Sequence, residues 1–218
     1  MTNAREVILG RVRAALAEAD RSEVHVPTAY RSRPEREGDV ERFVERVEDY
    51  RATVTRVPGD DPAAVVDAIV AALPDGGRVV VPSGLPWDLT GRADTTVDSN
   101  TATGAGGPDG DGRALSSTEL DGYAAVVTAA AVGIAETGTI VLTHEADQGR
   151  RAISLVPDLH VCVVRVDQVV PDVPAAFRRL DPGRPQTWIS GPSATSDIEL
   201  NRVEGVHGPR TLHVLLVG

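Results

Sequence analysis

The sequence predicts an α/β protein with a mostly parallel sheet, preceded by a helical arm. Two observations support this class. From residue 51 onward, short β-branched runs alternate with helical segments, which is typical of strands joined by crossover helices. Several of the later runs are continuously apolar, as expected for strands that are covered on both faces. We therefore expect an α/β domain over residues 51–218 and an N-terminal helical arm over residues 1–50.

The arm contains two helical patterns separated by a polar stretch. Apolar residues recur at three- and four-residue steps over residues 3–19 and again over residues 40–50. Residues 20–39 are rich in arginine and include Pro27 and Pro34, which favours an extended linker. The predicted order is helix, linker, helix.

The domain is expected to contain at least seven strands. Residues 62–72 predict a helix, because their apolar positions follow a helical period. The stretch 100–113 is rich in glycine, aspartate and threonine, and it predicts a surface loop. It lacks the third glycine of a dinucleotide-binding fingerprint. The predicted strands are residues 53–57, 78–81, 124–128, 139–143, 159–166, 186–190 and 211–217.

Composition excludes several classes of function. The 218 residues carry a net charge of -10, which argues against sequence-independent binding to nucleic acid. No apolar run approaches the roughly 20 residues that span a bilayer, and the N-terminus does not resemble an export signal, so we expect a cytoplasmic protein. All cations are arginines, which excludes Schiff-base chemistry on lysine. The single cysteine, Cys162, cannot hold an iron–sulfur cluster by itself.

The first candidate site segment places a carboxylate and two hydroxyls around a glycine, just before a buried strand. A turn at glycine would present the side chains on the surface, where loops of α/β proteins carry much of their chemistry. The alternative is a solvated turn with only local hydrogen bonds. The residues are Glu136, Thr137, Gly138 and Thr139.

The second segment leads from a predicted strand through a hydroxyl-rich loop into a predicted helix. Ser196 and Glu199 have the spacing of a capping box, which alone would explain part of the pattern. Unpaired amides at such a helix start also favour an anionic ligand. The segment lacks the second glycine of a nucleophile elbow, so a hydrolase is not indicated. The candidate residues are Ser190, Gly191, Ser193, Asp197 and Glu199.

The third segment, residues 205–210, displays His207 and Arg210 in a loop held by two glycines and a proline. Histidine titrates near neutral pH, and arginine can fork onto a carboxylate. The alternative is a rigid turn without function. We expect His160 and His213 to be packed within strands, and residues 144–147 to form a solvated turn and not a metal site.

Together these segments resemble the lactate-utilization protein C family, whose shared domain is named LUD for lactate utilization. The order and number of matching segments make the resemblance specific. The sequence departs from the family pattern at Ala194, at 129–131 and in the loop 100–113. The matching segments are residues 5–16, 43–50, 81–87, 134–142, 151 with 154–157, 190–193, 197–199 and 205–210.

The resemblance implies a three-layer α/β/α fold similar to ribose-phosphate isomerases and coenzyme A transferases. It also implies a role in oxidising L-lactate to pyruvate together with two iron–sulfur partner proteins. Since this chain has no cluster cysteines and no nicotinamide or flavin fingerprint, we expect it to bind no cofactor itself. The clusters are then expected in the partners, while this subunit binds substrate or assembles the complex.

A mechanistic hypothesis follows for a small 2-hydroxy acid. Arg151 or Arg210 forks onto the carboxylate, His207 takes the hydroxyl proton, and the loop from Ser190 to Ser193 orients the substrate. This hypothesis requires the three segments to meet in one crevice. The alternatives are a stand-alone coenzyme A transferase-like or sugar-phosphate-type enzyme that uses Glu136, and a scaffolding module without a pocket. The oligomeric state stays open.

Overall fold

The computed structural model describes residues 4–17, 19, 37–59, 61–99, 114–191, 194–195, 203–204 and 208–218. By its internal contacts, the chain divides into two compact units, Met1–Pro34 and Glu35–Gly218. Helix α2 (Val40–Asp49), which the sequence analysis grouped with the arm, therefore packs within the larger unit.

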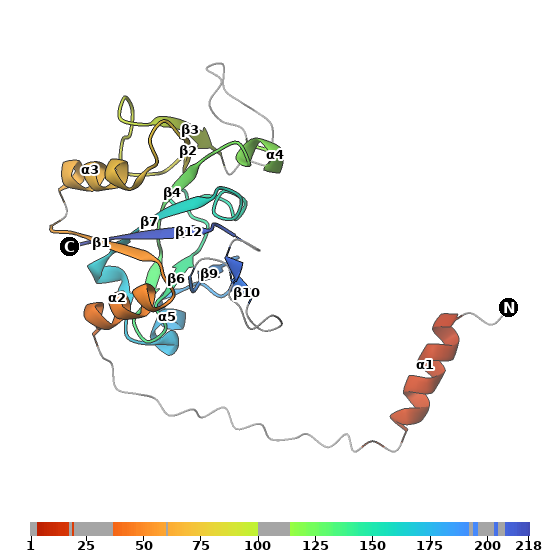
Figure 1. The fold of residues 1–218 in the computed structure, drawn as a ribbon. Helices are drawn as coiled ribbons and strands as arrows, with labels where there is room; N and C mark the ends of the chain where they lie inside the picture. Colours follow the sequence, from red (N-terminus) through yellow and green to blue (C-terminus); the bar gives the residue numbers. More distant parts are fainter. Residues whose placement is uncertain are drawn as a thin grey trace. The chain divides into compact units, whose positions relative to one another are not determined.

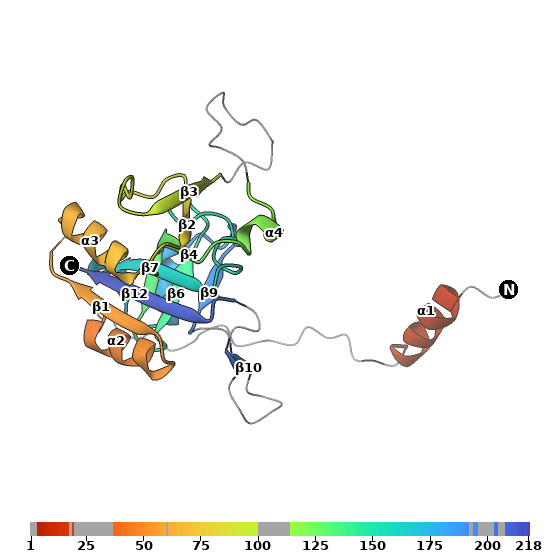
Figure 2. The ribbon, with the colours of Figure 1, turned by 45° about the horizontal axis from the view of Figure 1, so that its top comes forward.

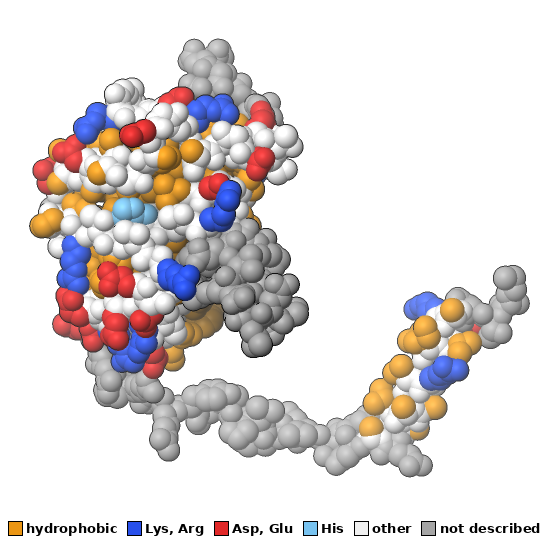
Figure 3. All heavy atoms as spheres, in the orientation of Figure 1, with side chains coloured by type: hydrophobic (Ala, Val, Ile, Leu, Met, Phe, Trp, Pro, Cys, Tyr) orange, Lys and Arg blue, Asp and Glu red, His pale blue; other side chains and the backbone are white. Residues whose placement is uncertain are grey.

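The smaller unit contains the first predicted helix, α1 (Ala4–Ala15). None of its residues is buried, and Val7, Ile8 and Val12 are exposed along one side. Figure 3 shows hydrophobic side chains on the surface of this helix. A helix of this length has marginal stability in water by itself, so its amphipathic pattern does not provide a core.

The larger unit is built on a six-stranded sheet in which every neighbouring pair is parallel (Figure 1). The strand order is β1-β12-β7-β4-β2-β3, so the C-terminal strand lies inside the sheet. This confirms the predicted α/β class with a mostly parallel sheet. The strands are β1 (Thr53–Val57), β2 (Arg78–Pro82), β3 (Asp94–Asp98), β4 (Ala125–Ala129), β7 (Leu159–Arg165) and β12 (Thr211–Val217).

Helices cover both faces of this sheet. Figure 2 shows α2 and α3 (Pro62–Ala72) on opposite sides of β1 and β12. Each begins at an aspartate whose side chain accepts a backbone hydrogen bond, Asp39 for α2 and Asp61 for α3. Two shorter helices are α4 (Ser117–Leu120) and α5 (Val173–Arg179). Within the described ranges, no helix is long and apolar enough to cross a membrane.

A second sheet of four strands packs beside α2. Its order is β8-β5-β6-β9, with antiparallel pairs on both sides of β6. The sequence predicted strands at residues 139–143 and 186–190 but did not show that they leave the parallel sheet, because an apolar run does not encode its partner. The strands are β5 (Val132–Ile134), β6 (Thr139–Leu142), β8 (Val169–Val170) and β9 (Thr187–Ile189). The short turn η1 (Val166–Gln168) precedes β8, and β10 (Ala194–Thr195) pairs with β11 (Val203–Glu204).

The main core lies where α2 and the two sheets meet. Phe43 of α2 is fully buried, and its ring approaches both Gly133 of β5 and Val164 of β7. A Cβ atom at Gly133 would lie 3.2 Å from that ring, so the small residue permits close packing. Phe43 thus joins a helix and both sheets in one apolar cluster.

We expect Phe43→Ala to destabilise the larger unit by about 3–5 kcal/mol, because it removes a fully buried ring from this junction. Urea unfolding followed by circular dichroism measures the change. Phe177→Ala is the matched control, since its ring is 54% exposed and its loss should cost far less. Equal losses in the two variants would contradict the central role of Phe43.

Candidate functional site

A chain of three hydroxyl groups links two of the predicted site segments. Thr137 Oγ1 lies 2.7 Å from Thr139 Oγ1, which lies 2.8 Å from Ser190 Oγ. Thr137 belongs to the turn before β6 and Thr139 is the first residue of β6, whereas Ser190 directly follows β9. The antiparallel pairing of β6 with β9 therefore brings together residues that are 51 positions apart in the sequence.

Tyr50 contacts both of these segments. Its hydroxyl donates a 2.7 Å hydrogen bond to the carbonyl oxygen of Gly138. Gly191 lies directly against its ring, because a Cβ atom there would sit 2.7 Å from Cδ2. Gly191 also has a φ of +108°, a conformation that favours glycine. Burial raises the pKa of the Tyr50 hydroxyl, so it stays protonated and keeps donating.

Glu136 lies on the turn between β5 and β6 and is half-buried. Its backbone nitrogen donates to the carbonyl oxygen of Pro171 at 3.1 Å, which ties the turn to the segment after β8. Glu136 does not line the cavity described next. Glu136 therefore directly precedes Thr137 of the hydroxyl chain in the sequence, but its side chain is not part of the cavity lining.

A cavity of about 220 Å³ lies between the two sheets at the edge where β7 and β12 begin. His160 of β7 and Leu212 of β12 are register partners on the same face of the parallel sheet. Strand β9 lies on the opposite side of the cavity. The lining residues are Arg151, Ser154, Leu155, His160, Thr187, Trp188, Ile189, Gly191, Gly208, Pro209 and Leu212.

His160 is the most buried polar residue of the lining, with 1% of its surface exposed. Its Nε2 atom lies 2.8 Å from Thr128 Oγ1, so the ring is held in one orientation. Burial lowers the pKa of His160 to about 4, because the charged form is poorly solvated there. The imidazole is therefore neutral near neutral pH, and it agrees with the expected packed histidine.

Thr187 is another polar residue of the cavity lining, and its side chain contacts a second histidine, His144. Its hydroxyl lies 3.0 Å from His144 Nε2, and His144 Nδ1 lies 2.9 Å from the carbonyl oxygen of Gly149. His144 has a φ of +59°, an uncommon conformation outside glycine. The predicted solvated turn at this position is thus partly wrong, because His144 is half-buried and contacts β9.

The arginines of this region differ in what they already bind. Arg210 forks onto Asp158, with Nε–Oδ1 and Nη2–Oδ2 distances of 2.9 and 2.5 Å. Arg150 forks in the same way onto the buried Asp98, at 2.7 and 2.8 Å. The guanidinium of Arg151 makes no hydrogen bond or ion pair to any residue of the described ranges, and Arg151 lines the cavity. Of these three, Arg151 is the one whose guanidinium is open to a ligand.

Four predicted site residues, Ser193, Asp197, Glu199 and His207, lie outside the described residues. The predicted capping box at residues 196–199 and the predicted loop 100–113 also lie outside them. Of the predicted residues that are described, Arg151 and Gly191 line the cavity, and Ser190 is adjacent to it in the chain. Within the described part of the chain, no three His, Cys, Asp or Glu residues cluster to hold a metal ion.

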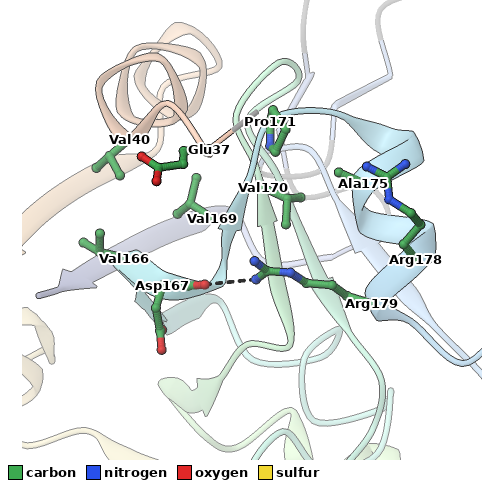
Figure 4. A pocket seen from close by; sticks show the side chains of 11 residues that line it. Glu37, Val40, Val166, Asp167, Val169, Val170, Pro171, Ala175, Arg178 and Arg179 are labelled. Atoms are coloured by element: carbon green, nitrogen blue, oxygen red, sulfur yellow. Dashed lines mark hydrogen bonds between the residues drawn. The ribbon is translucent and has the colours of Figure 1, made fainter. Parts of the chain in front are cut away.

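A larger pocket of about 630 Å³ lies elsewhere, between α2 and α5 (Figure 4). Its floor consists of valines, among them Val169 and Val170, and Arg178 and Arg179 stand at its rim. Arg179 donates to the carbonyl oxygen of Asp167 at 2.9 Å. This pocket contains none of the predicted site residues, so its size alone does not make it the site.

Sequence patterns missed Tyr50, Ser154 and Thr187. Tyr50 follows a helix as its last apolar position, and the other two resemble ordinary polar residues beside strands. No local pattern marks them, because their roles arise from contacts with distant segments. The hydroxyl-rich composition around Ser190 and the resemblance over residues 43–50, 151 and 154–157 pointed toward this part of the chain, but neither gave these side chains a role.

The geometry defines an α/β protein with a small cavity between a parallel and a mixed sheet. The LUD domain family matches residues 40–217, and the chain belongs to this family. A crystal structure of a DUF162 family protein from Deinococcus radiodurans is similar, with a TM-score of 0.63 and 41% sequence identity. That likeness covers 82% of this chain and 96% of the other.

Two relatives illustrate the range of similarity. Lactate utilization protein C of Deinococcus radiodurans is 49% identical over 81% of this chain and 78% of its own length. Uncharacterized protein YkgG of Escherichia coli is 36% identical over 38% of this chain and 39% of its own length. The predicted resemblance to the lactate-utilization protein C family is confirmed.

The depressed pKa of His160 makes folding stability depend on pH. Between about pH 6.5 and pH 4 the unfolded chain binds a proton at this residue that the folded chain does not, so stability falls as pH is lowered through this window. From pH 7 to pH 5 we expect a loss on the order of 1–2 kcal/mol from this group. Urea unfolding at the two pH values measures it.

His160→Gln is the matched variant, because glutamine can still bond to Thr128 but does not titrate. Its stability should change less between pH 7 and pH 5 than that of the unmodified chain. An identical pH dependence in both proteins would contradict the assignment.

Proposed function

We propose that this chain acts in the oxidation of L-lactate to pyruvate, in the cytoplasm, together with two iron–sulfur proteins. The observation that carries the proposal is the 49% identity to a protein named Lactate utilization protein C over four fifths of the chain. The LUD domain match over residues 40–217 includes the segments that form the hydroxyl chain and the cavity.

The electrons of this reaction need an acceptor outside this chain. Its one cysteine, Cys162, is fully buried, and burial raises the pKa of its thiol to about 12. Thr128 Oγ1 donates to its sulfur at 3.7 Å. A buried, protonated thiol does not suit an iron–sulfur cluster, which takes several thiolates. We therefore assign the clusters to the partner proteins.

The proposed chemistry begins with positioning of the substrate. The guanidinium of Arg151 has no partner among the described residues and forks onto the lactate carboxylate, whereas that of Arg210 is engaged by Asp158. Ser190 orients the substrate, and His207 accepts the hydroxyl proton. Oxidation removes two electrons and two protons from lactate: His207 takes the hydroxyl proton, the proton on carbon 2 is released to water, and the two electrons would pass one at a time to the partners' clusters.

The alternative is an acyl-transfer enzyme with a covalent intermediate on Glu136. No contact of the described residues favours it, and Glu136 lies outside the cavity lining. Mass spectrometry after incubation with acyl-coenzyme A discriminates the two functions. A stable mass increase on Glu136 would support acyl transfer and contradict the role in lactate oxidation.

The first test is a reconstitution with purified iron–sulfur partners. Addition of L-lactate should reduce the partners' clusters, as followed by visible absorbance, only when this chain is present. Reduction of the partners' clusters at the same rate without this chain would contradict the proposal. Purified partners and the full chain are used throughout.

The second test concerns the proton acceptor. His207→Ala should lower turnover of the reconstituted system by more than about tenfold and leave the melting temperature nearly unchanged, because the loss of a general base slows the chemical step. Arg178→Gln, at the rim of the other pocket, is the control that should retain full turnover. Full activity of His207→Ala would refute the assignment.

A further inference from the structure

Helix α1 presents an apolar stripe that is exposed along its length. Ile8, Val12 and Leu16 follow one another at four-residue steps, so they lie on the same side of the helix. Their exposed fractions are 60%, 47% and 47%. Leu16 continues the helix beyond Ala15, because its N–H donates to the carbonyl oxygen of Val12 at 3.0 Å. We call these three residues the α1 stripe.

Exposed apolar side chains are concentrated on this helix. Six large apolar side chains are exposed in the described part of the chain, and four of them lie within residues 7–16. The other two, Phe177 and Trp188, contact each other on the larger unit. Single exposed apolar residues are ordinary, whereas a group of them on one element indicates an interaction surface.

Resting on the proposed function, we infer that α1 is the segment by which this chain binds one of its iron–sulfur partner proteins. The α1 stripe lies in an apolar groove of the partner, and carboxylates border that groove on both sides. The contact is then made outside the LUD domain, whose match begins at residue 40. Binding of the partner is thereby separated from the cavity in the larger unit.

The charges of α1 specify the border of the groove. Arg11 and Arg13 directly precede and follow Val12, so their positions lie roughly 100° around the helix axis to either side of it. The helix contains three arginines and one glutamate, although the whole chain carries a net charge of -10. Since arginine pairs well with carboxylates, a groove with an acidic border complements this arrangement.

A second copy of this chain is a poorer match for α1. In its larger unit, the exposed large apolar side chains of the described residues are Phe177 and Trp188. Arg178 and Arg179 directly follow Phe177 in α5, so this aromatic pair has cations beside it. Those cations would repel the arginines of α1. The charges therefore favour a different protein as the partner.

The composition of α1 favours a protein groove over a lipid surface. Helices that lie on membranes commonly place Trp, Phe or Leu on the apolar face and many basic residues on the other. Helix α1 contains no aromatic residue, and Ile8 and Val12 of its stripe are β-branched. Aliphatic anchors spaced by three or four residues are typical of helices that bind in a groove of another protein.

Binding also supplies stability that α1 lacks by itself. A helix of 12 residues is marginally stable in water, and none of the residues of α1 is buried. Burial of the α1 stripe in a groove stabilises the helical conformation, because apolar surface is removed from water. The backbone amides of the helix then become protected from exchange with solvent.

Hydrogen exchange followed by mass spectrometry locates the contact in the full chain. The amides of residues 4–15 should exchange rapidly when the chain is alone. They should exchange at least about tenfold more slowly when one of the purified iron–sulfur partners is added at saturating concentration, because the helix is then held in place. Unchanged exchange at residues 4–15 with both partners would overturn the inference.

Matched variants test the α1 stripe. Val12→Asp should weaken binding to the partner by about tenfold or more, because it places an unpaired charge in an apolar groove. Ala14→Asp introduces the same charge about 200° around the helix from Val12 and should bind nearly as the unmodified chain does. Neither residue is buried, so the melting temperature of the larger unit should stay unchanged in both variants. Equal weakening by the two variants would contradict the role of the stripe.

A double variant tests the acidic border of the groove. Arg11→Gln combined with Arg13→Gln should weaken binding several-fold, because two charge-assisted contacts are lost. It should also make the affinity less sensitive to added salt than that of the unmodified chain, since salt screens exposed charge pairs. An affinity that depends on salt equally in both proteins would contradict the acidic border.

The outcomes separate this inference from the proposed function. Undiminished binding of Val12→Asp to the partners would overturn the inference even if cluster reduction required this chain. Binding that depends on Val12 would support it even if L-lactate did not reduce the clusters, in which case only the proposed function would fail. Binding of the unmodified chain to phosphatidylglycerol vesicles, lost in Val12→Asp, would overturn the inference in favour of a lipid surface.

Discussion

The contact on which the rest of this structure depends is the apolar interface between the parallel sheet and the four-stranded sheet. Side chains of α2, β6, β7 and β12 share one buried cluster there, with Phe43 at the junction. Burial of such a continuous apolar surface supplies the main free energy that holds two sheets together. The interface fixes the distance between β9 and the edge of the parallel sheet, and thereby the geometry of the cavity.

The candidate site lies where this interface ends. Toward the start of β7 and β12 the apolar filling gives way to His160, Ser154 and Thr187, each buried and each hydrogen-bonded to a neighbour. Buried polar groups are tolerated when their partners are in place, so a cavity with a few polar side chains can border an apolar core. His160 and His144 act here as hydrogen-bonding groups, since Thr128 contacts one ring nitrogen of His160 and Thr187 contacts one ring nitrogen of His144.

Most elements of the larger unit could be predicted, while their grouping could not. The periodicities of α2 and α3 and the apolar runs of β7 and β12 are local properties, and each of these four elements is present within a few residues of its predicted bounds. Strands β6 and β9 were also predicted, but their antiparallel pairing in a separate sheet was not. Pairing depends on surfaces that are far apart in sequence, and a run of apolar residues fits either sheet equally well.

The sequence by itself determined the α/β class, the family, the absence of lysine and the single cysteine, because these follow from composition, local period and the order of motifs. Only the tertiary structure decided which arginine is open to a ligand, since Arg151 and Arg210 look alike in sequence and differ only in whether Asp158 reaches them. It also decided that Tyr50 supports the hydroxyl chain and that His160 borders a cavity. These are properties of contacts between distant segments, and such contacts form only when the chain has folded.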